Sequence, residues 1–384
     1  MNFTNAIPAA LALLSFALAL WQWLAARRFP LHHRVADPAF APAITLLKPL
    51  KGSDETTADS LQSWFNQNYT GPAQILFGVA DANDPVCKIV NELIRKNPAC
   101  AAQLVVCGES LGTNAKISTL IQLERLAKHG LILIGDADVR VPPDFLANVV
   151  APLRDDKTGL VNCFYRLANP ATWAMRWEAV AINADFWSQV LQAASIKPLD
   201  FALGAVILLR RKVLTEAGGF NPLANCLADD YQLGQRIAGH GHRIALCPVV
   251  VECWNAPMNW RDVWRHQLRW ARTIRVCQPL PYFFSILANA TLWPLLWLLI
   301  SLASSATLCA PLVAGTCLLV RICLAQNLQR RFTPSRALVS PAWLVPVKDL
   351  LQVALWAGAF LGNKITWRGQ RMKLRGDGTL VAEK

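Results

Sequence analysis

Two long stretches of the chain carry no charged side chain, and they constrain its fold more than any other feature. Residues 1–26 contain no Asp, Glu, Lys or Arg, and neither do the 45 residues from Val276 to Val320. A membrane-spanning helix needs roughly 20 apolar residues. The first stretch therefore predicts one span and the second predicts two, with a turn near Ser304-Ser305 or Pro311.

The composition agrees with a membrane protein. Only 16% of the 384 residues are charged and 54% are hydrophobic, whereas soluble domains carry about 25% charged residues. Arg27 and Arg28 follow the first apolar stretch, while a signal peptide has its basic residues in front. We interpret residues 1–28 as a signal anchor, with the chain that follows in the cytosol.

A further apolar stretch, residues 342–362, is interrupted by Lys348-Asp349. If it spans the bilayer, the basic residues before it and those after it lie on opposite sides, which conflicts with the positive-inside rule. A re-entrant or interfacial segment avoids that conflict. We predict a membrane region over 276–364, with two spans and a third span or re-entrant segment, followed by a basic tail over 365–384.

The net charge of +13 suits nucleic acid or anionic lipid. Because the basic clusters flank the apolar stretches, we expect a lipid bilayer as partner and no nucleic acid. The eleven cysteines form no Cys-x-x-Cys pair, which predicts free thiols in a reducing compartment.

Residues 42–275 have the composition of a globular domain and alternate between apolar strands and helices. Continuous apolar strands of this kind indicate an α/β fold with a mostly parallel sheet and helices on both faces. Ligands bind at the carboxyl ends of such strands. The predicted strands are 43–47, 74–79, 104–106 and 131–134, and the predicted helices are 57–66, 84–96 and 115–128.

Asp136 and Asp138 directly follow the fourth predicted strand. Two carboxylates at this spacing supply the oxygen ligands that a divalent cation prefers, and they leave positions open for phosphate. The alternative is a strand-end turn with solvated carboxylates. The position in an alternating fold favours the metal site.

Other polar residues also follow the predicted strands. Asp81 follows the second strand and is a candidate ligand for a nucleotide, whereas Asp84 is the expected cap of the next helix. Lys51 and Lys116 lie in turns that either bind phosphate or are ordinary helix caps, and both interpretations remain open. Asp230 lies at a predicted helix start and is either a cap or a general base.

The segment from His266 through Arg269 and Trp270 to Arg275 is basic and precedes the long apolar stretch. Its spacing alone predicts a helix at the membrane surface. The sequence has no Walker loop and no Gly-x-Gly-x-x-Gly motif, so NTPase and Rossmann oxidoreductase functions lack support.

Taken in order, these motifs resemble those of the ceramide glucosyltransferases, glycosyltransferase family 21, and of their bacterial relatives that glycosylate hopanoids. The resemblance runs from about Ala43 to Trp270 and continues at Trp367-Arg-Gly-Gln-Arg371. The motifs are Lys48-Pro-Leu-Lys51-Gly52, Asp81, Gly112-Thr-Asn-Ala-Lys116, Asp136-Ala-Asp138, Asp229-Asp230-Tyr231 and Arg269-Trp270.

The resemblance implies a GT-A-like nucleotide-sugar-binding domain with transmembrane helices at both ends. It also implies that Asp81 contacts uridine and that Asp230 is the catalytic base of an inverting transfer. Asp136 and Asp138 are implied to hold Mg²⁺ or Mn²⁺, and Asp136 also contacts the donor diphosphate. The other donor-binding residues would be Lys51, Lys116, His266, Arg269 and Trp270. The family commonly has Gln or Arg at the place of His266, which as a cation can reach the diphosphate.

We therefore expect an integral protein of a bacterial inner membrane with its catalytic domain on the cytoplasmic side. It would move one hexose, glucose or N-acetylglucosamine, from a UDP-sugar to the hydroxyl of a membrane lipid, ceramide or a hopanoid polyol. One alternative is a processive polysaccharide synthase of the cellulose or hyaluronan type, which requires a channel of more helices. The other is a non-catalytic membrane scaffold.

Overall fold

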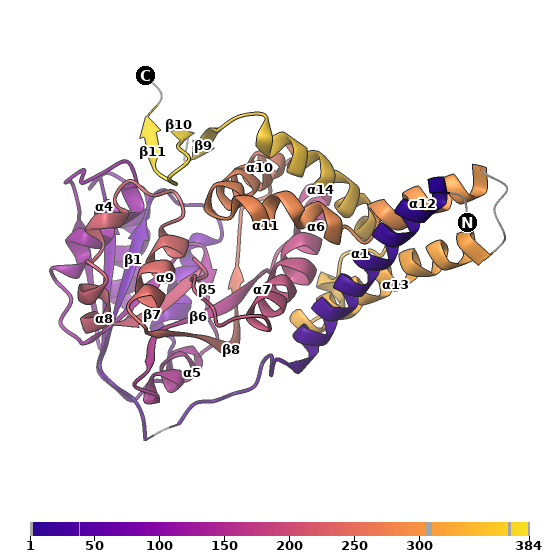
Figure 1. The fold of residues 1–384 in the computed structure, drawn as a ribbon. Coiled ribbons are helices and arrows are strands. Elements are labelled where there is room, and N and C mark those ends of the chain that lie inside the picture. Colours follow the sequence, from indigo (N-terminus) through magenta and orange to yellow (C-terminus); the bar gives the residue numbers. More distant parts are fainter. Residues whose placement is uncertain (1–2, 38, 304–308, 368–369, 383–384) are drawn as a thin grey trace. The chain divides into compact units, whose positions relative to one another are not determined.

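The computed structural model describes residues 3–37, 39–303, 309–367 and 370–382. The chain forms two compact units, and each is assembled from three separate segments (Figure 1). We call them the sheet unit and the helical unit. The sheet unit comprises Pro30–Asn169, Lys197–Ala256 and Gln370–Lys384, and the helical unit comprises Met1–Phe29, Pro170–Ile196 and Pro257–Gly369.

The sheet unit is built on an eight-stranded sheet of order β3-β2-β1-β4-β7-β6-β8-β5. The first four of these strands run parallel, and β7 is antiparallel to both of its neighbours. The strands are β1 Ile44–Leu50, β2 Ala73–Val79, β3 Ala101–Val106, β4 Leu131–Gly135, β5 Val139–Arg140, β6 Thr158–Leu167, β7 Val206–Arg210 and β8 Arg243–Cys253. The predicted α/β class is therefore confirmed, with an antiparallel strand inside the sheet.

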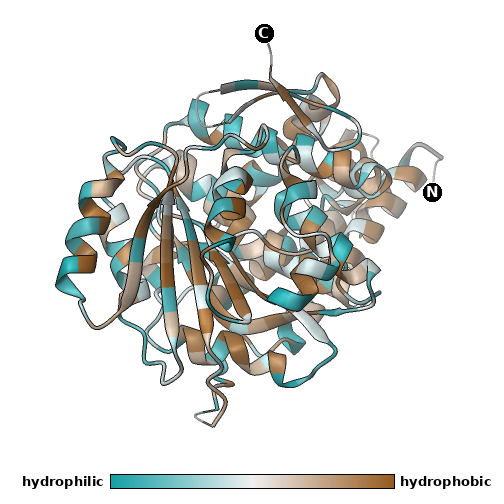
Figure 2. Cartoon of the chain, turned by 90° about the vertical axis from the view of Figure 1, so that its left-hand side faces the viewer, coloured by the Kyte–Doolittle hydropathy of each residue, from teal (hydrophilic) through white to brown (hydrophobic). Residues whose placement is uncertain are grey.

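Helices cover both faces of this sheet because successive strand residues point to opposite sides. Leu46 packs into one hydrophobic core and Leu47 into the other. Figure 2 shows the apolar strands between helices that turn hydrophilic faces outward. The helices are α2 Thr57–Phe65, α3 Val86–Lys96, α4 Ala115–Glu124, α5 Phe145–Val150, α8 Arg211–Glu216 and α9 Asp229–Gly239. A short antiparallel pair, β10 Gln370–Leu374 and β11 Leu380–Ala382, completes the unit.

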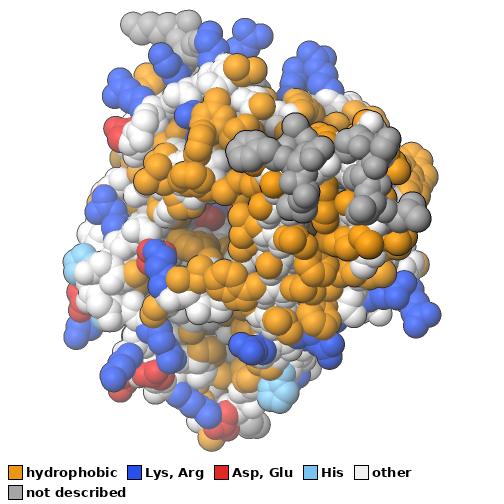
Figure 3. Space-filling model, turned by 45° about the vertical axis from the view of Figure 1, so that its right-hand side comes forward, with side chains coloured by type: hydrophobic (Ala, Val, Ile, Leu, Met, Phe, Trp, Pro, Cys, Tyr) orange, Lys and Arg blue, Asp and Glu red, His pale blue; other side chains and the backbone are white. Residues whose placement is uncertain are grey.

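Among the described residues of the helical unit, two helices are long and apolar enough to cross a membrane, Asn5–Arg28 and Cys309–Phe332. The pair Pro279–Ala288 and Leu292–Ala303 passes the same test together but is bent by 42°. Figure 3 shows hydrophobic side chains gathered over a broad face. The exposed large apolar side chains of this unit include Leu13, Leu14, Leu299, Leu302, Leu312 and Leu319.

The helices of this unit, which include these segments, follow in chain order. They are α1 Phe3–Arg28, α6 Trp173–Val180, the π-helical turn η2 Ala181–Phe186, α7 Trp187–Ala194, α10 Trp260–Cys277, α11 Pro279–Phe284, α12 Leu292–Ala303, α13 Cys309–Phe332 and α14 Leu344–Phe360. The predicted turn at Ser304-Ser305 lies outside the described residues, as do Arg368 and Gly369 of the last family motif.

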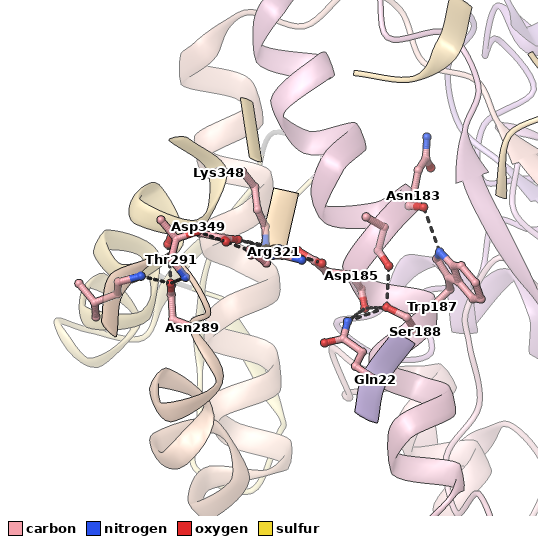
Figure 4. Close-up of polar contacts among 12 residues, drawn as sticks. Gln22, Asn183, Asp185, Trp187, Ser188, Asn289, Thr291, Arg321, Lys348 and Asp349 are labelled. Atoms are coloured by element: carbon pink, nitrogen blue, oxygen red, sulfur yellow. Dashed lines mark hydrogen bonds and ion pairs between the residues drawn. The ribbon is translucent and has the colours of Figure 1, made fainter. Parts of the chain in front are cut away.

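The interruption at Lys348-Asp349 lies in the second turn of α14, where both side chains are buried against protein (Figure 4). Arg321 Nη2 of α13 lies 2.9 Å from Asp185 Oδ2 and 2.8 Å from Asp349 Oδ1. Lys348 pairs with Asp185 as well, and Thr291 Oγ1 donates to Asp349 Oδ2 at 2.6 Å. Two cations and two anions therefore neutralise one another inside the unit, which is how buried charges are tolerated. We call Asp185, Arg321, Lys348 and Asp349 the four-charge cluster.

Candidate functional site

Asp136 and Asp138 lie where β4 ends, as the sequence predicts, and the backbone anchors each of them. The Asp136 N–H donates to the Ala205 carbonyl at 3.1 Å, and the Asp138 carbonyl accepts the Trp254 N–H at 3.0 Å. Both side chains are half-buried. The two carboxylates are thus held by neighbouring strands rather than by a free loop.

Lys116 of α4 connects Asp136 to the start of α9. Its Nζ lies 2.8 Å from Asp136 Oδ1 and 3.4 Å from Asp229 Oδ2. Burial alone would lower the pKa of this ammonium, but Asp136 and Asp229 together hold it well above its usual value. Asn114 accepts the Ile117 N–H at 3.2 Å as the helix cap and donates to Asp229 Oδ1 at 3.3 Å. The predicted turn is therefore both a cap and the place of a permanent cation.

Asp230 is the second residue of α9 and lies beside this ion pair. Burial raises the pKa of its carboxyl to about 6, the charge of Asp229 adds to the rise, and Lys116 opposes it. A Cβ placed on Gly204 would lie 2.7 Å from Asp230 Oδ2, so only glycine leaves room for this carboxylate. A carboxyl that titrates near neutrality is suited to take up a proton.

Lys48 begins one of the family motifs, but its burial beside Asp136 was not predicted. It lies on β1 with no exposed surface, its Nζ donates to the Asp136 carbonyl, and it sits 4.5 Å from the centre of the Trp64 ring. Burial lowers its pKa to about 7, although Asp136 and Asp138 oppose the shift. A lysine within a continuous apolar strand was the available signal, because a buried lysine requires a partner.

Asp81 and Lys51 lie at the ends of β2 and β1, which precede β4 in the sheet order. Both side chains are exposed. Asp81 Oδ1 accepts the Asn83 N–H at 2.9 Å, which closes a local turn. Asp84 Oδ1 accepts the Val86 N–H and the Gly52 N–H, each at 3.0 Å. The N-cap residue of α3 is Pro85 and not Asp84 as predicted; the Asp84 carboxylate instead accepts the N–H of Val86, the first residue of α3, and fixes the turn after β1.

His266, Arg269 and Trp270 lie on α10 in the helical unit, and Glu178, a residue absent from the prediction, contacts the first of them. Glu178 of α6 accepts hydrogen bonds from His266 Nδ1 and from Gln267 Nε2, both at 2.7 Å. The His266 and Trp270 rings lie 4.6 Å apart. The signal for Glu178 was an acidic residue, with Arg176 two positions before it, in a mostly apolar stretch.

The sequence profile of glycosyl transferase family 21 matches residues 7–380. The chain belongs to this family.

Among curated family 21 relatives, ceramide glucosyltransferase 3 of Caenorhabditis elegans is 24% identical over 220 residues, which cover 57% of this chain and 48% of the relative. The ceramide glucosyltransferase of Candida albicans is 31% identical over 128 residues, or 30% of this chain and 24% of the relative. The matched regions thus span about half or less of those proteins.

The mannosyltransferase PcManGT of Pyrobaculum calidifontis, solved with GDP-Man and Mn²⁺, aligns with this family 21 chain at a TM-score of 0.57. The alignment covers 93% of this chain and 97% of that one at 22% identity. This likeness confirms the predicted GT-A-like fold class with apolar helices at both ends.

The donor set of this family 21 site contains two carboxylates that suit a hard cation. Within the described ranges, no group of three or more His, Cys, Asp or Glu side chains is arranged to hold a metal. Mg²⁺ commonly binds through one or two carboxylates together with phosphate oxygens and water. Asp136 and Asp138 therefore fit a cation that a phosphate-bearing ligand helps to coordinate.

Proposed function

We propose that this family 21 chain moves one hexose, glucose or N-acetylglucosamine, from a UDP-sugar to the hydroxyl of a membrane lipid, ceramide or a hopanoid polyol. The observation that carries the proposal is Asp230, a carboxyl with a pKa of about 6 beside the Lys116–Asp136 ion pair. The names of the curated relatives support a lipid acceptor, and the apolar helices support a membrane location.

Donor binding is assigned to residues at the carboxyl end of the sheet. Asp81 would contact uridine, and Lys51 and Lys116 would contact the phosphates. Asp136 and Asp138 would hold Mg²⁺ or Mn²⁺, which when bound neutralises charge on the diphosphate. His266, Arg269 and Trp270 are proposed as further donor-binding residues.

In the proposed transfer step, one bond forms, one bond breaks and one proton moves. The lipid hydroxyl oxygen attacks the anomeric carbon opposite the diphosphate, the new carbon–oxygen bond forms, and the bond to the phosphate oxygen breaks with inversion. Asp230 takes the hydroxyl proton. Lys116 remains cationic throughout and stabilises the charge that develops on the leaving diphosphate.

The membrane arrangement remains part of the proposal. We propose an anchor over residues 1–28, a cytoplasmic catalytic domain over 42–275, a membrane region over 276–364 and a basic tail over 365–384, in a bacterial inner membrane. The helical segment 170–196 interrupts the sheet unit and belongs to the helical unit.

The test uses the full chain in lipid nanodiscs with radiolabelled UDP-glucose or UDP-N-acetylglucosamine and either ceramide or a hopanoid polyol. We expect one acceptor to gain one hexose and Asp230→Asn to abolish the transfer while UDP still binds. Normal transfer by that variant would overturn the proposal. Polymer formed without lipid would indicate a processive synthase. A lack of metal-dependent UDP binding would instead favour a non-catalytic membrane scaffold.

A further inference from the structure

We propose that the C-terminal end of the sheet unit is a positioning element of the candidate site, which holds the turn in front of α9 so that Asp230 stays beside Lys116. We call residues 370–382, which form β10, β11 and the turn between them, the C-terminal hairpin. The inference deepens the proposed function and rests on it, since Asp230 is the base only in that proposal.

The start of α9 has no capping side chain of its own. Ala228 occupies the N-cap position, and an alanine has no side-chain oxygen to accept a backbone N–H of the first turn. Asp229 and Asp230 are the first two residues of this helix, so fraying of the first turn would displace both carboxylates. The start of α9 therefore needs support from outside the helix.

The backbone of the C-terminal hairpin supplies part of this support. The Leu380 N–H donates to the Asn225 carbonyl at 2.7 Å, and the Leu227 N–H donates to the Gly378 carbonyl at 3.2 Å. These two bonds flank a short antiparallel bridge. Residues 225–227 thus pair with the hairpin as one strand pairs with another, directly in front of α9.

The same hairpin also contacts the turn in front of α4. Thr113 Oγ1 lies 3.3 Å from the Leu380 carbonyl and 3.2 Å from Asn225 Oδ1. The Thr113 N–H donates to the same Asn225 oxygen at 3.0 Å. Thr113 directly precedes Asn114, the cap of α4, and Lys116 follows in the first turn of that helix. The hairpin therefore contacts both turns that carry the proposed chemistry.

The local sequence explains why the hairpin adopts this shape. Asp377 Oδ1 accepts the N–H and the hydroxyl of Thr379, at 2.9 and 2.7 Å, and Gly378 between them has a φ of +85°. Glycine adopts such a φ at no steric cost. Leu374 and Leu380 are 1% and 2% exposed, so packing anchors both strands. The turn is thereby fixed with the Gly378 carbonyl directed at the segment in front of α9.

The experiment compares two glycine variants of this turn, using the full chain in nanodiscs. Gly378→Val puts a β-branched side chain at a φ that such residues do not adopt, so the turn should open and release the Leu227 N–H. Gly376→Val is the matched control, because Gly376 lies in the same turn, its φ is not positive and nothing lies within 4 Å of its added Cβ.

We expect Gly378→Val to reduce kcat by about tenfold to a hundredfold, as a displaced catalytic group would. Amide hydrogen exchange, measured by mass spectrometry over residues 227–232, should become faster in the same variant. The affinity for UDP should stay unchanged, because the donor-binding residues at the ends of β2 and β4 are untouched. Gly376→Val should match the wild type in all three measurements.

Two variants of Thr113 decide the question if Gly378→Val does not fold. Thr113→Val removes the hydroxyl that contacts the hairpin, whereas Thr113→Ser keeps it. The valine variant should lose kcat by about fivefold, as the loss of one hydrogen bond would give, and the serine variant should keep it. Equal kcat of the two would overturn the role of the hairpin at the turn in front of α4.

The outcomes separate this inference from the proposed function. If the wild type transfers no hexose to either lipid, the proposed function fails. If the wild type transfers hexose and Gly378→Val keeps its kcat and its exchange rate, only the positioning role of the C-terminal hairpin is overturned.

Discussion

Lys116 Nζ lies 2.8 Å from Asp136 Oδ1, so one ammonium connects α4 to the end of β4. The same Nζ lies 3.4 Å from Asp229 Oδ2 at the start of α9. Lys116 thus balances two carboxylates that would otherwise repel each other and Asp230. The three elements that carry the proposed chemistry depend on this one cation.

Replacing Lys116 by Met tests that dependence. Without the cation, the pKa of Asp230 should rise further, because Lys116 is the group that lowers it. The acid limb of the pH–rate profile should move to higher pH, and kcat should fall by roughly a hundredfold or more. Lys116→Arg keeps the charge and should keep the position of the acid limb. An unchanged profile in Lys116→Met would contradict the assignment.

Asp230 should control the acid limb of the wild-type rate. With a pKa of about 6, it loses its role as base when pH falls below that value. Asp229→Asn removes a charge that raises this pKa, so its acid limb should move to lower pH. The check is the pH dependence of kcat in both proteins at saturating donor.

The same shift predicts a change in stability. The folded-state pKa of Asp230 lies above the ordinary value of 3.8, so its contribution to stability is fully present below about pH 4 and is lost as pH rises through about 6. Asp230→Asn should therefore stabilise the protein at pH 8 by on the order of 1 kcal/mol, with no gain at pH 4. A thermal melt at the two pH values measures this difference.

A substitution at Gly204 would move the Asp230 carboxylate without changing the Asp230 side chain itself. A Cβ there would lie 2.7 Å from Asp230 Oδ2, which is closer than van der Waals contact allows. Gly204→Ala should displace the carboxylate and reduce kcat by about tenfold to a hundredfold. Gly108→Ala is the control, because nothing lies within 4 Å of its added Cβ. Equal activity of the two variants would refute the close approach.

The first four strands and the residues that follow them could be predicted, because they depend on short local patterns in the sequence. The strands β1 to β4 are apolar runs that end in turns, and Asp136, Asp138 and Asp230 stand where such turns place ligands. The pairing of β7 between β4 and β6 was not predicted, because residues 206–210 are far in the sequence from the residues with which they pair.

The contacts of Lys48 and Glu178 were not predicted, and the reason is the same for both. Lys48 belongs to the site because it contacts the Trp64 ring and the Asp136 carbonyl. Glu178 contacts His266 because α10 packs against α6. Burial of a charged side chain by distant elements cannot be read from its immediate neighbours in the sequence. A charged side chain in a mostly apolar stretch is the local sign of such burial, but it does not identify the partner.

Removal of the divalent cation should stop the proposed transfer. Activity should disappear in EDTA and return with Mn²⁺ or Mg²⁺, because the leaving diphosphate then regains charge compensation. Asp138→Asn should weaken the apparent metal affinity by about tenfold to a hundredfold. Asp156→Asn, at a fully exposed side chain paired with Arg210, should leave it unchanged. Full activity in EDTA would exclude the assigned metal role of Asp136 and Asp138.

The four-charge cluster should tolerate the loss of a matched pair better than the loss of one charge. Asp185→Asn leaves Arg321 and Lys348 with Asp349 as their one anion in the cluster, and such an unpaired buried charge costs about 3–5 kcal/mol. Lys348→Met in the same chain restores neutrality, because Arg321 and Asp349 remain 2.8 Å apart. The double variant should therefore melt at a higher temperature than Asp185→Asn alone. Additive losses in this double-mutant cycle would show that the charges do not interact.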